Sequence, residues 1–170
     1  MAVTVAPLAE GDAQELLRRG LREADVREAW KTAGMPPDRA LAFSLAHSLF
    51  AASIRLDGRI CALLGVGCAD ALLHTGIPWM VAHQELETPA IAVPVARIIK
   101  RFVTHWLTVF PRLENCADPA HTNALRTLQW AGFTLETGIA AGPLGHHLVR
   151  FWQNSRARKN TNHERNDPCV

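Results

Sequence analysis

The chain has 170 residues, of which 48% are hydrophobic and 20% charged, and its formal net charge is +2. This length predicts one domain with a single core and is too short for two domains of ordinary size. The small net charge gives no overall field from which nucleic-acid binding could be argued, so partners have to be inferred from particular sites. The four cysteines form no CxxC pair, which favours reduced thiols over disulfides or a zinc site.

The first third of the sequence predicts one short strand and three helices. The strand is expected at residues 3–7, where valines alternate with small or polar residues. The first helix is expected at 12–20, with Asp12 and Glu15 as a capping box. The second and third helices are expected at 22–32, ended by Gly34, and from Pro37 to Ala52, with Leu41, Leu45 and Leu49 at helical spacing.

The middle of the sequence changes to the pattern of strands. Two extended runs, 53–56 and 59–66, flank Asp57 and Gly58, and Asp-Gly is among the best signals for a tight hairpin because both positions tolerate a positive φ. Another strand is expected at 78–83. The apolar run in this region is about half of the roughly 20 residues needed to cross a bilayer, so no membrane span is predicted.

The last part of the chain predicts a long amphipathic helix and a second group of strands. Hydrophobic residues of 94–110 fall on one helical face and basic residues on the other, so this helix is expected to cover a sheet. A short helix capped by Thr122 or Asn123 and ended by Gly132 should follow. Strands are expected at 113–116, 133–136 and 146–152, and the polar, basic residues after 152 are expected to be a disordered tail.

This order of elements predicts an α+β or α/β fold with one mixed sheet. No metal site is predicted, because His146 and His147 are neighbours in a strand and point to opposite faces. The basic tail, Arg156 to Arg165, either touches nucleic acid or an acidic partner or only keeps the chain soluble. The five tryptophans fit core packing, or a cleft that docks another protein.

The segment from His121 to Phe133 resembles the last helix-to-strand turn of the GNAT family of N-acetyltransferases. Aligned on Gly132 and Phe133, His121 stands where the family has an Asn. Leu128 stands where the family has the Tyr that protonates the departing coenzyme A thiolate, and the chain contains no tyrosine. The resemblance covers most of residues 1–152 and implies a mainly antiparallel central sheet with helices on both faces, followed by a tail at 153–170.

A narrower resemblance concerns three short motifs. Pro78-Trp79-Met80, Phe110-Pro111-Arg112-Leu113 and the segment 118–133 look like acetyltransferase-like internal virion or morphogenesis proteins of short-tailed bacteriophages. This resemblance implies a protein of the bacterial host cytoplasm that is also a candidate for incorporation in the virion. Its implied partners are other virion proteins or a host protein.

The family resemblance also implies a set of site residues for acetyl coenzyme A (acetyl-CoA). The pantetheine arm would pair with the strand that holds Met80, Val81, Ala82 and His83, and Asn123 would also contact the cofactor. Glu85 is the implied general base and His121 the implied acid. The pyrophosphate loop of the family would fall at 87–95, where this chain has no glycine and two prolines, each of which removes a backbone donor.

Three functions follow as alternatives. The first is an acetyltransferase-like phage protein that works as a virion-assembly or protein-binding module, with catalysis lost or reduced. The second is an active N-acetyltransferase that transfers acetyl from acetyl-CoA to an amine. The third is a host-takeover inhibitor that binds a bacterial protein. The sequence names neither the substrate nor the oligomeric state.

Overall fold

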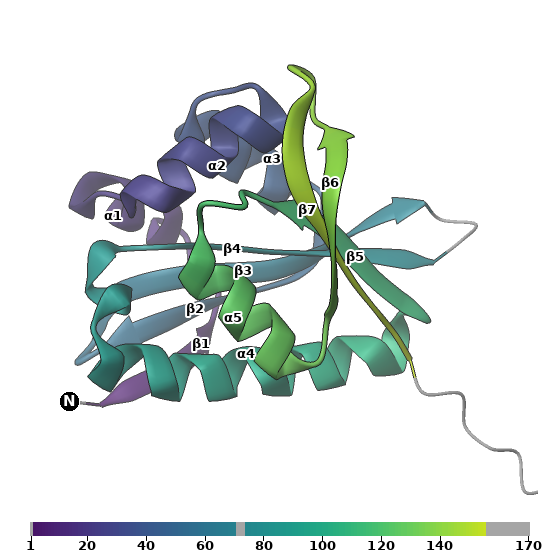
Figure 1. Ribbon diagram of the computed structural model, residues 1–170. Helices are drawn as coiled ribbons and strands as arrows, with labels where there is room; N and C mark the ends of the chain where they lie inside the picture. Colours follow the sequence, from purple (N-terminus) through teal and green to yellow (C-terminus); the bar gives the residue numbers. More distant parts are fainter. Residues whose placement is uncertain (1, 71–73, 156–170) are drawn as a thin grey trace, which may run out of the picture.

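The computed structural model describes residues 2–70 and 74–155, in which a seven-stranded sheet has the order β1-β2-β3-β4-β5-β7-β6 (Figure 1). The strands are β1 (Val3–Pro7), β2 (Ser48–Leu56), β3 (Arg59–Asp70), β4 (Thr75–Ala82), β5 (Arg112–Ala117), β6 (Thr134–Ala141) and β7 (His146–Asn154). The helices are α1 (Asp12–Arg19), α2 (Glu23–Ala33), α3 (Pro37–Ala46), the 3-10 helix η1 (Gln84–Glu87), α4 (Pro89–Val109) and α5 (Thr122–Ala131). All pairings except β4 with β5 are antiparallel, which confirms the predicted mixed, mainly antiparallel sheet.

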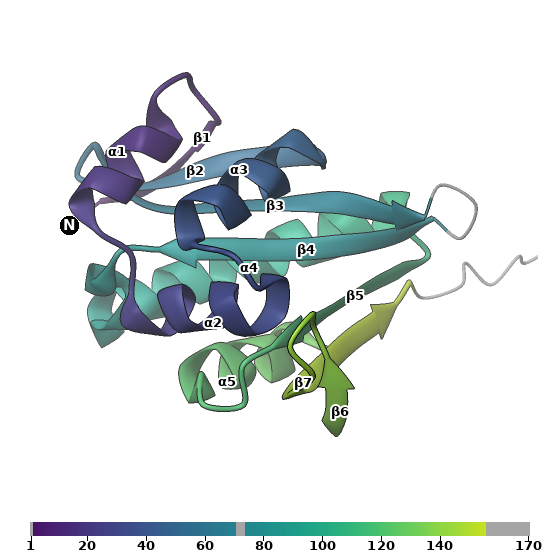
Figure 2. The same ribbon diagram turned by 90° about the horizontal axis from the view of Figure 1, so that it is seen from above.

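Helices cover both faces of the sheet, as Figures 1 and 2 show. Helices α1 to α3 lie on one face, where Leu16 and Leu41 pack with Ile60 and Leu63 of β3. Helices α4 and α5 lie on the other face, over a larger core that includes Trp106. No helix in the described ranges is long and apolar enough to cross a membrane.

The sheet is nearly divided at its centre. Strands β4 and β5 pair only through Thr75 with Arg112 and Gly76 with Leu113, and beyond these two pairs they separate. A Cβ atom at Gly76 would lie 2.7 Å from the Leu113 side chain, so glycine permits the close approach of the two strands at this junction. The separation opens a space between the carboxyl halves of β4 and β5.

Several local predictions are confirmed by the backbone. Asp57 and Gly58 both have positive φ, 47° and 83°, as the predicted tight hairpin between β2 and β3 requires. Helices α2 and α5 end at left-handed glycines, Gly34 and Gly132. Strand β7 extends to Asn154, two residues past the boundary expected for the domain. The expected tail falls outside the described residues from 156 onward.

The predicted third helix was too long. The observed helix, α3, ends at Ala46, and the residues at the expected end, Leu49 and Ala52, belong to β2. The His47 ring stacks on Phe43 at 4.0 Å and lies 2.8 Å from the Phe43 carbonyl oxygen, which closes the helix. The following residues pair with β3, so tertiary pairing overrides their helical spacing.

The predicted helix starts were also partly wrong. Asp12 and Glu15 form no capping box, because Asp12 accepts from Arg55 at 2.6 Å and Glu15 accepts from the Ile60 amide at 3.2 Å. Helix α5 begins after His121, without a side-chain cap from Thr122 or Asn123. Helix α4 begins five residues before Pro94, at Pro89. The missing N–H of Pro94 leaves the carbonyl of Ala90, an exposed residue, for water.

Candidate functional site

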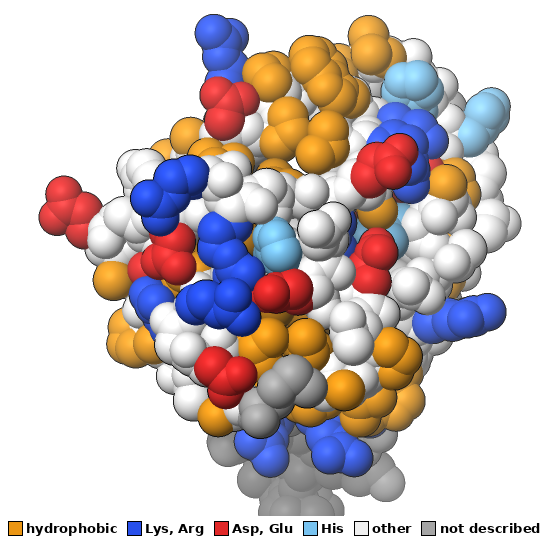
Figure 3. All heavy atoms as spheres, turned by 90° about the vertical axis from the view of Figure 1, so that its left-hand side faces the viewer, with side chains coloured by type: hydrophobic (Ala, Val, Ile, Leu, Met, Phe, Trp, Pro, Cys, Tyr) orange, Lys and Arg blue, Asp and Glu red, His pale blue; other side chains and the backbone are white. Residues whose placement is uncertain are grey.

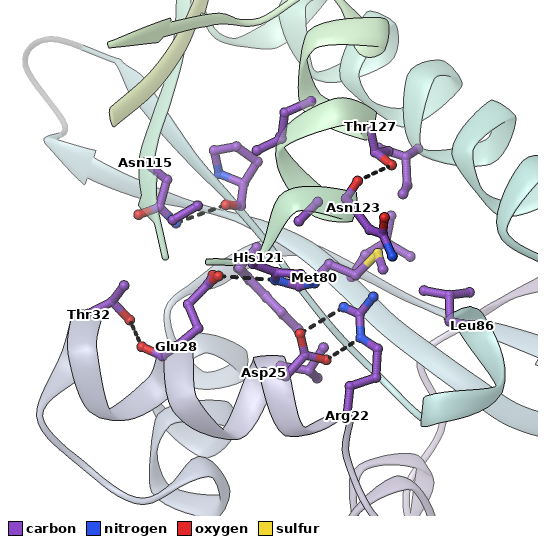
Figure 4. Close-up of a pocket in the computed structure, with 18 of the residues that line it drawn as sticks. Arg22, Asp25, Glu28, Thr32, Met80, Leu86, Asn115, His121, Asn123 and Thr127 are labelled. Atoms are coloured by element: carbon purple, nitrogen blue, oxygen red, sulfur yellow. Dashed lines mark hydrogen bonds and ion pairs between the residues drawn. The ribbon is translucent and has the colours of Figure 1, made fainter. Parts of the chain in front are cut away.

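A cavity of about 600 Å³ lies where β4 and β5 separate. Its walls come from α2, α3, β4, α4, β5 and α5, so it is assembled from segments far apart in the sequence (Figure 4). Most of the wall is apolar, with Met80, Leu86, Val95, Leu128 and Phe133 among the contributors. Trp106 also lines it, and its buried indole N–H has no hydrogen-bond partner among the described residues.

The backbone of β4 presents alternate residues to this space. The His83 amide donates to Cys61 of β3, and Val81 pairs with Leu63, so these two residues face β3. By the period of a strand, the backbone groups of Pro78, Met80 and Ala82 face β5. Because proline has no N–H, these three residues offer five polar groups to the space.

Three of these five groups are already hydrogen-bonded within the protein. The Asn115 amide donates to the Pro78 carbonyl at 3.0 Å, the Ala82 amide donates to Asp25 at 2.7 Å, and the Arg22 amide donates to the Ala82 carbonyl at 2.8 Å. Only the N–H and C=O of Met80 remain for a ligand. The family resemblance assigned cofactor pairing to this strand, and the structure leaves it one residue for that purpose.

Asn115 bridges the two separated strands with one side chain. Its amide nitrogen donates to Pro78 of β4, and its carbonyl oxygen accepts from the Cys116 amide of β5 at 2.8 Å. Figure 4 shows the Asn115 side chain reaching across from β5. One half-buried amide side chain therefore satisfies one backbone group on each side of the opening.

Arg22 and Asp25 form a buried ion pair at the start of α2. Arg22 donates twice to Asp25, at 2.9 and 2.7 Å, and the residues are 8% and 6% exposed. Burial raises the pKa of Asp25, although Arg22 and the Ala82 amide act in the opposite direction. A two-bond pair of this kind holds α2 against the end of β4.

A second charged group joins α2 to the turn between β5 and α5. The fully buried carboxylate of Asp118 accepts from Arg27 and from Lys31, both at 2.8 Å. Burial by itself would raise the pKa of Asp118, but the hydrogen bonds from Lys31 and Arg27 outweigh it and lower the pKa to about 2. The Asp118 amide also donates to Glu28 at 3.2 Å.

His121 lines the cavity. It is 6% exposed, and its Nδ1 is 3.3 Å from the carboxylate of Glu28 (Figure 4). A carboxylate at Nδ1 fixes the ring and favours a proton on that nitrogen, so that Nε2 is free to accept one. Leu128, at the position of the family's Tyr, is another residue of the cavity wall and has no proton to give.

Glu85 does not line the cavity. It lies in η1, where Arg19 donates to it at 2.7 Å and Arg59 and His83 are 3.6 and 3.4 Å away. The hydrogen bond from Arg19 is the main cause of a lowered Glu85 pKa, and a lowered pKa makes the carboxylate a weaker base. Figure 3 shows this end of the molecule, with basic and acidic side chains next to one another.

The start of α4 does not have the form of a pyrophosphate site. Pro89 has no N–H, and the amides of Ile91 and Ala92 donate to the Thr88 carbonyl, both at 2.9 Å. Glu87 lines the adjacent cavity wall with a negative charge. A phosphate group at a helix start needs free amides and a positive field, so these residues do not fit the diphosphate of coenzyme A in the family manner.

The remaining sequence-predicted residues divide between the cavity and the sheet. Asn123 lines the cavity near Met80, and its backbone carbonyl accepts from Thr127 (Figure 4). Arg22, Asp25, Glu28 and Asn115 were not predicted as site residues. The first three recur every three residues from the N-cap of α2 into the helix, and that polar stripe was the available signal. In the described parts of the chain, no group of three or more His, Cys, Asp or Glu could hold a metal ion.

No protein-family model and no curated protein sequence matches the chain. Solved structures do match it. AAC(6')-Ib in complex with ribostamycin and coenzyme A is 14% identical, with a TM-score of 0.68 over 96% of this chain and 99% of that one. Spermidine N-acetyltransferase from Vibrio cholerae, in complex with CoA and spermine, is 12% identical, with a TM-score of 0.65 over 90% and 95%.

A GNAT-family acetyltransferase from Streptococcus pneumoniae is 10% identical, with a TM-score of 0.62 over 90% of this chain and 99% of that one. Identities this low establish the architecture and nothing about activity. The sheet order, the central separation of β4 from β5 and the helices on both faces agree with this likeness. The chain therefore has the GNAT acetyltransferase fold.

Proposed function

We propose that this chain is a GNAT-like protein-binding module in which acetyl transfer is lost or much reduced. The β4 backbone carries the proposal, because Asn115, Arg22 and Asp25 already occupy three of its five groups that face the space between β4 and β5. A pantetheine arm bound in the family manner would have to displace some of these bonds. Displacing Asp25 would leave Arg22 with a buried, unpaired charge.

Two other features support the loss of catalysis. Leu128 stands where the family implies a proton-donating Tyr, and the chain has no tyrosine to replace it. The first turn of α4 holds a proline and a neighbouring Glu87 where the diphosphate would need amides and a positive field. Different residues therefore disfavour the binding of coenzyme A and the transfer of the acetyl group.

The cavity is instead suited to an apolar group of a protein partner. Two of its lining side chains are largely exposed large hydrophobics, Phe43 at 57% and Val93 at 52%. Buried aromatic and apolar anchors in pockets supply much of the affinity of protein interfaces.

By the narrower resemblance, the partner is another phage virion protein or a host protein, and the protein acts in virion assembly or in host takeover. The fractionation of purified particles and infected cells distinguishes these two roles.

Calorimetric titration with coenzyme A and with acetyl-CoA tests the loss of cofactor binding. We expect no binding at micromolar concentrations and no rise in melting temperature, because a ligand of the native state stabilises it by mass action. A cofactor-binding acetyltransferase of the same fold serves as the positive control. A micromolar complex with either coenzyme A or acetyl-CoA would overturn the proposal.

An active N-acyltransferase is the second candidate, favoured by one observation. The pair of His121 and Glu28 places an oriented imidazole in the cavity wall. In that case this chain's own proton carrier is His121, positioned by Glu28. Release of free thiol from acetyl-CoA in the presence of an amine panel tests it, with Glu28→Gln as the variant and Glu85→Gln as its comparison. Loss only in Glu85→Gln would return the role of base to Glu85, and equal loss in both would contradict a particular role for the pair of His121 and Glu28.

A further inference from the structure

We propose that the outer face of α4 and α5 binds single-stranded nucleic acid. We call this surface the α4/α5 face and define it by Arg97, Lys100, Arg101, Arg126 and Trp130, which are all exposed. The two helices contact each other along one side of the sheet (Figure 2). Arg126 also lines the cavity, whereas the other four residues do not. The inference rests mainly on those four and does not depend on the proposed loss of acetyl transfer.

The charges of the chain are separated in space despite the small net charge. Residues 156–170 hold four of the 18 Lys and Arg and two of the 16 Asp and Glu, which leaves 14 of each in residues 1–155. This part of the chain is therefore neutral overall. Yet α4, with 21 residues, and α5, with 10, contain no Asp or Glu at all. The four basic residues of the α4/α5 face thus have no acidic neighbour on their own helices.

The basic residues of this face also lack ion-pair partners. Eight of the 14 described Lys and Arg lie within 4.0 Å of a carboxylate: Arg19, Arg22, Arg27, Lys31, Arg55, Arg59, Arg112 and Arg150. Of the six for which the described residues provide no such pair, four belong to the α4/α5 face and only Arg18 and Arg39 lie elsewhere. Unpaired cations therefore concentrate on one surface.

Their spacing increases the field of this surface. Arg97 lies three residues before Lys100 and four before Arg101, which places all three on neighbouring turns of one helix side. Like charges at this spacing destabilise a helix, and no carboxylate in α4 offsets the repulsion. An anionic partner would reduce this repulsion, so the repulsion itself favours the binding of phosphate groups.

An aromatic ring lies within the charged surface. The Lys100 ammonium is 4.5 Å from the centre of the Trp130 ring and 3.3 Å from the Trp130 carbonyl oxygen, so the two helices share this contact. Trp130 is 48% exposed. An exposed ring beside phosphate-binding cations is the arrangement that stacks unpaired bases, and duplex DNA offers no free base face to it. This favours a single strand over a duplex or an acidic protein.

Fluorescence anisotropy with a labelled oligothymidylate of about 16 nucleotides tests the inference on the full chain. Arg97→Gln/Arg101→Gln removes two charges from the surface, and Arg18→Gln/Arg39→Gln removes two exposed charges elsewhere, so both variants have the same net charge. We expect the first to weaken binding about tenfold at low salt and to lower the slope of log K against log salt by roughly 1.4, at about 0.7 per phosphate contact. The second should match the wild type.

Trp130→Ala and Trp130→Phe test the aromatic part. The alanine variant should lose affinity by roughly five- to 150-fold, and the phenylalanine variant should recover most of it, because stacking tolerates any aromatic ring. Thermal unfolding followed by circular dichroism confirms that each variant is folded. Equal losses in the two double variants, equal competition by polyglutamate, or displacement of the oligonucleotide by micromolar coenzyme A would each overturn the inference.

Discussion

Strands β1 to β4 form one continuous antiparallel ladder, whereas β5, β7 and β6 form a second ladder that meets the first at only two residue pairs. Within each ladder, successive backbone hydrogen bonds fix the geometry. Between the ladders, side chains fix the geometry, because β4 and β5 are not paired beyond Gly76 and Leu113. The shape of the opening is therefore set by individual residues.

Three groups of side chains span the two parts. Asn115 joins β5 to β4 directly, Asp118 joins the end of β5 to α2 through Arg27 and Lys31, and Asp25 joins α2 to the end of β4. Substitutions here should act on the connection between the ladders rather than on either ladder itself. A few polar contacts can therefore occupy most of the backbone groups at the edge of β4 while the sheet itself stays unchanged.

The largest effect is expected from Leu113→Ala, at the junction of the two ladders. Leu113 is fully buried against Gly76 and Phe110, so the change should lower the free energy of unfolding by about 3 kcal/mol. Urea unfolding measures it, with Leu49→Ala, at a 60% exposed leucine, as the control near zero. If Leu113→Ala raises hydrogen exchange equally in both ladders, the two ladders do not behave as separate units that are joined at this junction.

Asp118→Asn should have the next largest effect. The neutral amide cannot satisfy Arg27 and Lys31 as a carboxylate does, and we expect a loss of about 2–3 kcal/mol, below the value for fully buried pairs because both cations are partly exposed. Glu136→Gln, which weakens a 3.8 Å surface pair with Arg150, is the matched control and should change stability by less than about 0.5 kcal/mol. Similar values for the two would show that Asp118 does not connect the ladders.

The pH dependence of stability should report the same carboxylate. The folded-state pKa of Asp118, about 2, lies below its ordinary value of 3.8. Its contribution of about 2 kcal/mol is therefore fully present above roughly pH 5 and is lost as the pH falls from about 4 to 2. Wild type should lose more stability over this range than Asp118→Asn, as measured by urea unfolding at each pH. Glu85 and Glu114, whose pKa values are also lowered, remain in both proteins, so their effects on stability cancel in the comparison. Parallel curves of stability against pH for the two proteins would exclude the effect of Asp118.

Local sequence signals predicted the elements that depend on local chemistry. The hairpin at Asp57 and Gly58, the helix end at Gly34 and the amphipathic α4 all follow from residue type and spacing. The end of α3 did not, because Leu49 has helical spacing and becomes a strand residue only because its neighbours Ser48 and Phe50 pair with β3. Patterns within about ten residues cannot report a partner strand elsewhere in the chain.

The site was less predictable than the fold. His121 and Leu128 could be placed by the resemblance, since they lie in one short segment that keeps its order. Asp25 and Asn115 could not, because each becomes important only through a backbone group of β4, 57 and 37 residues away. Glu85 looked suitable as a base from its place after a strand, and the sequence could not show that Arg19 would pair with it.

Asn115→Ala should give the smallest change in stability and the most direct test of how the opening is closed. It removes the bonds to the Pro78 carbonyl and the Cys116 amide. Both residues line the cavity, so we expect a loss of only about 1 kcal/mol. Hydrogen exchange at the Cys116 amide should rise while exchange in the β2–β3 ladder stays constant. Because the Pro78 carbonyl is then free, any affinity for coenzyme A should increase relative to wild type. Unchanged exchange at Cys116 would mean that the side chain of Asn115 does not hold the two parts of the sheet together, and that the opening owes its shape to the packing around it.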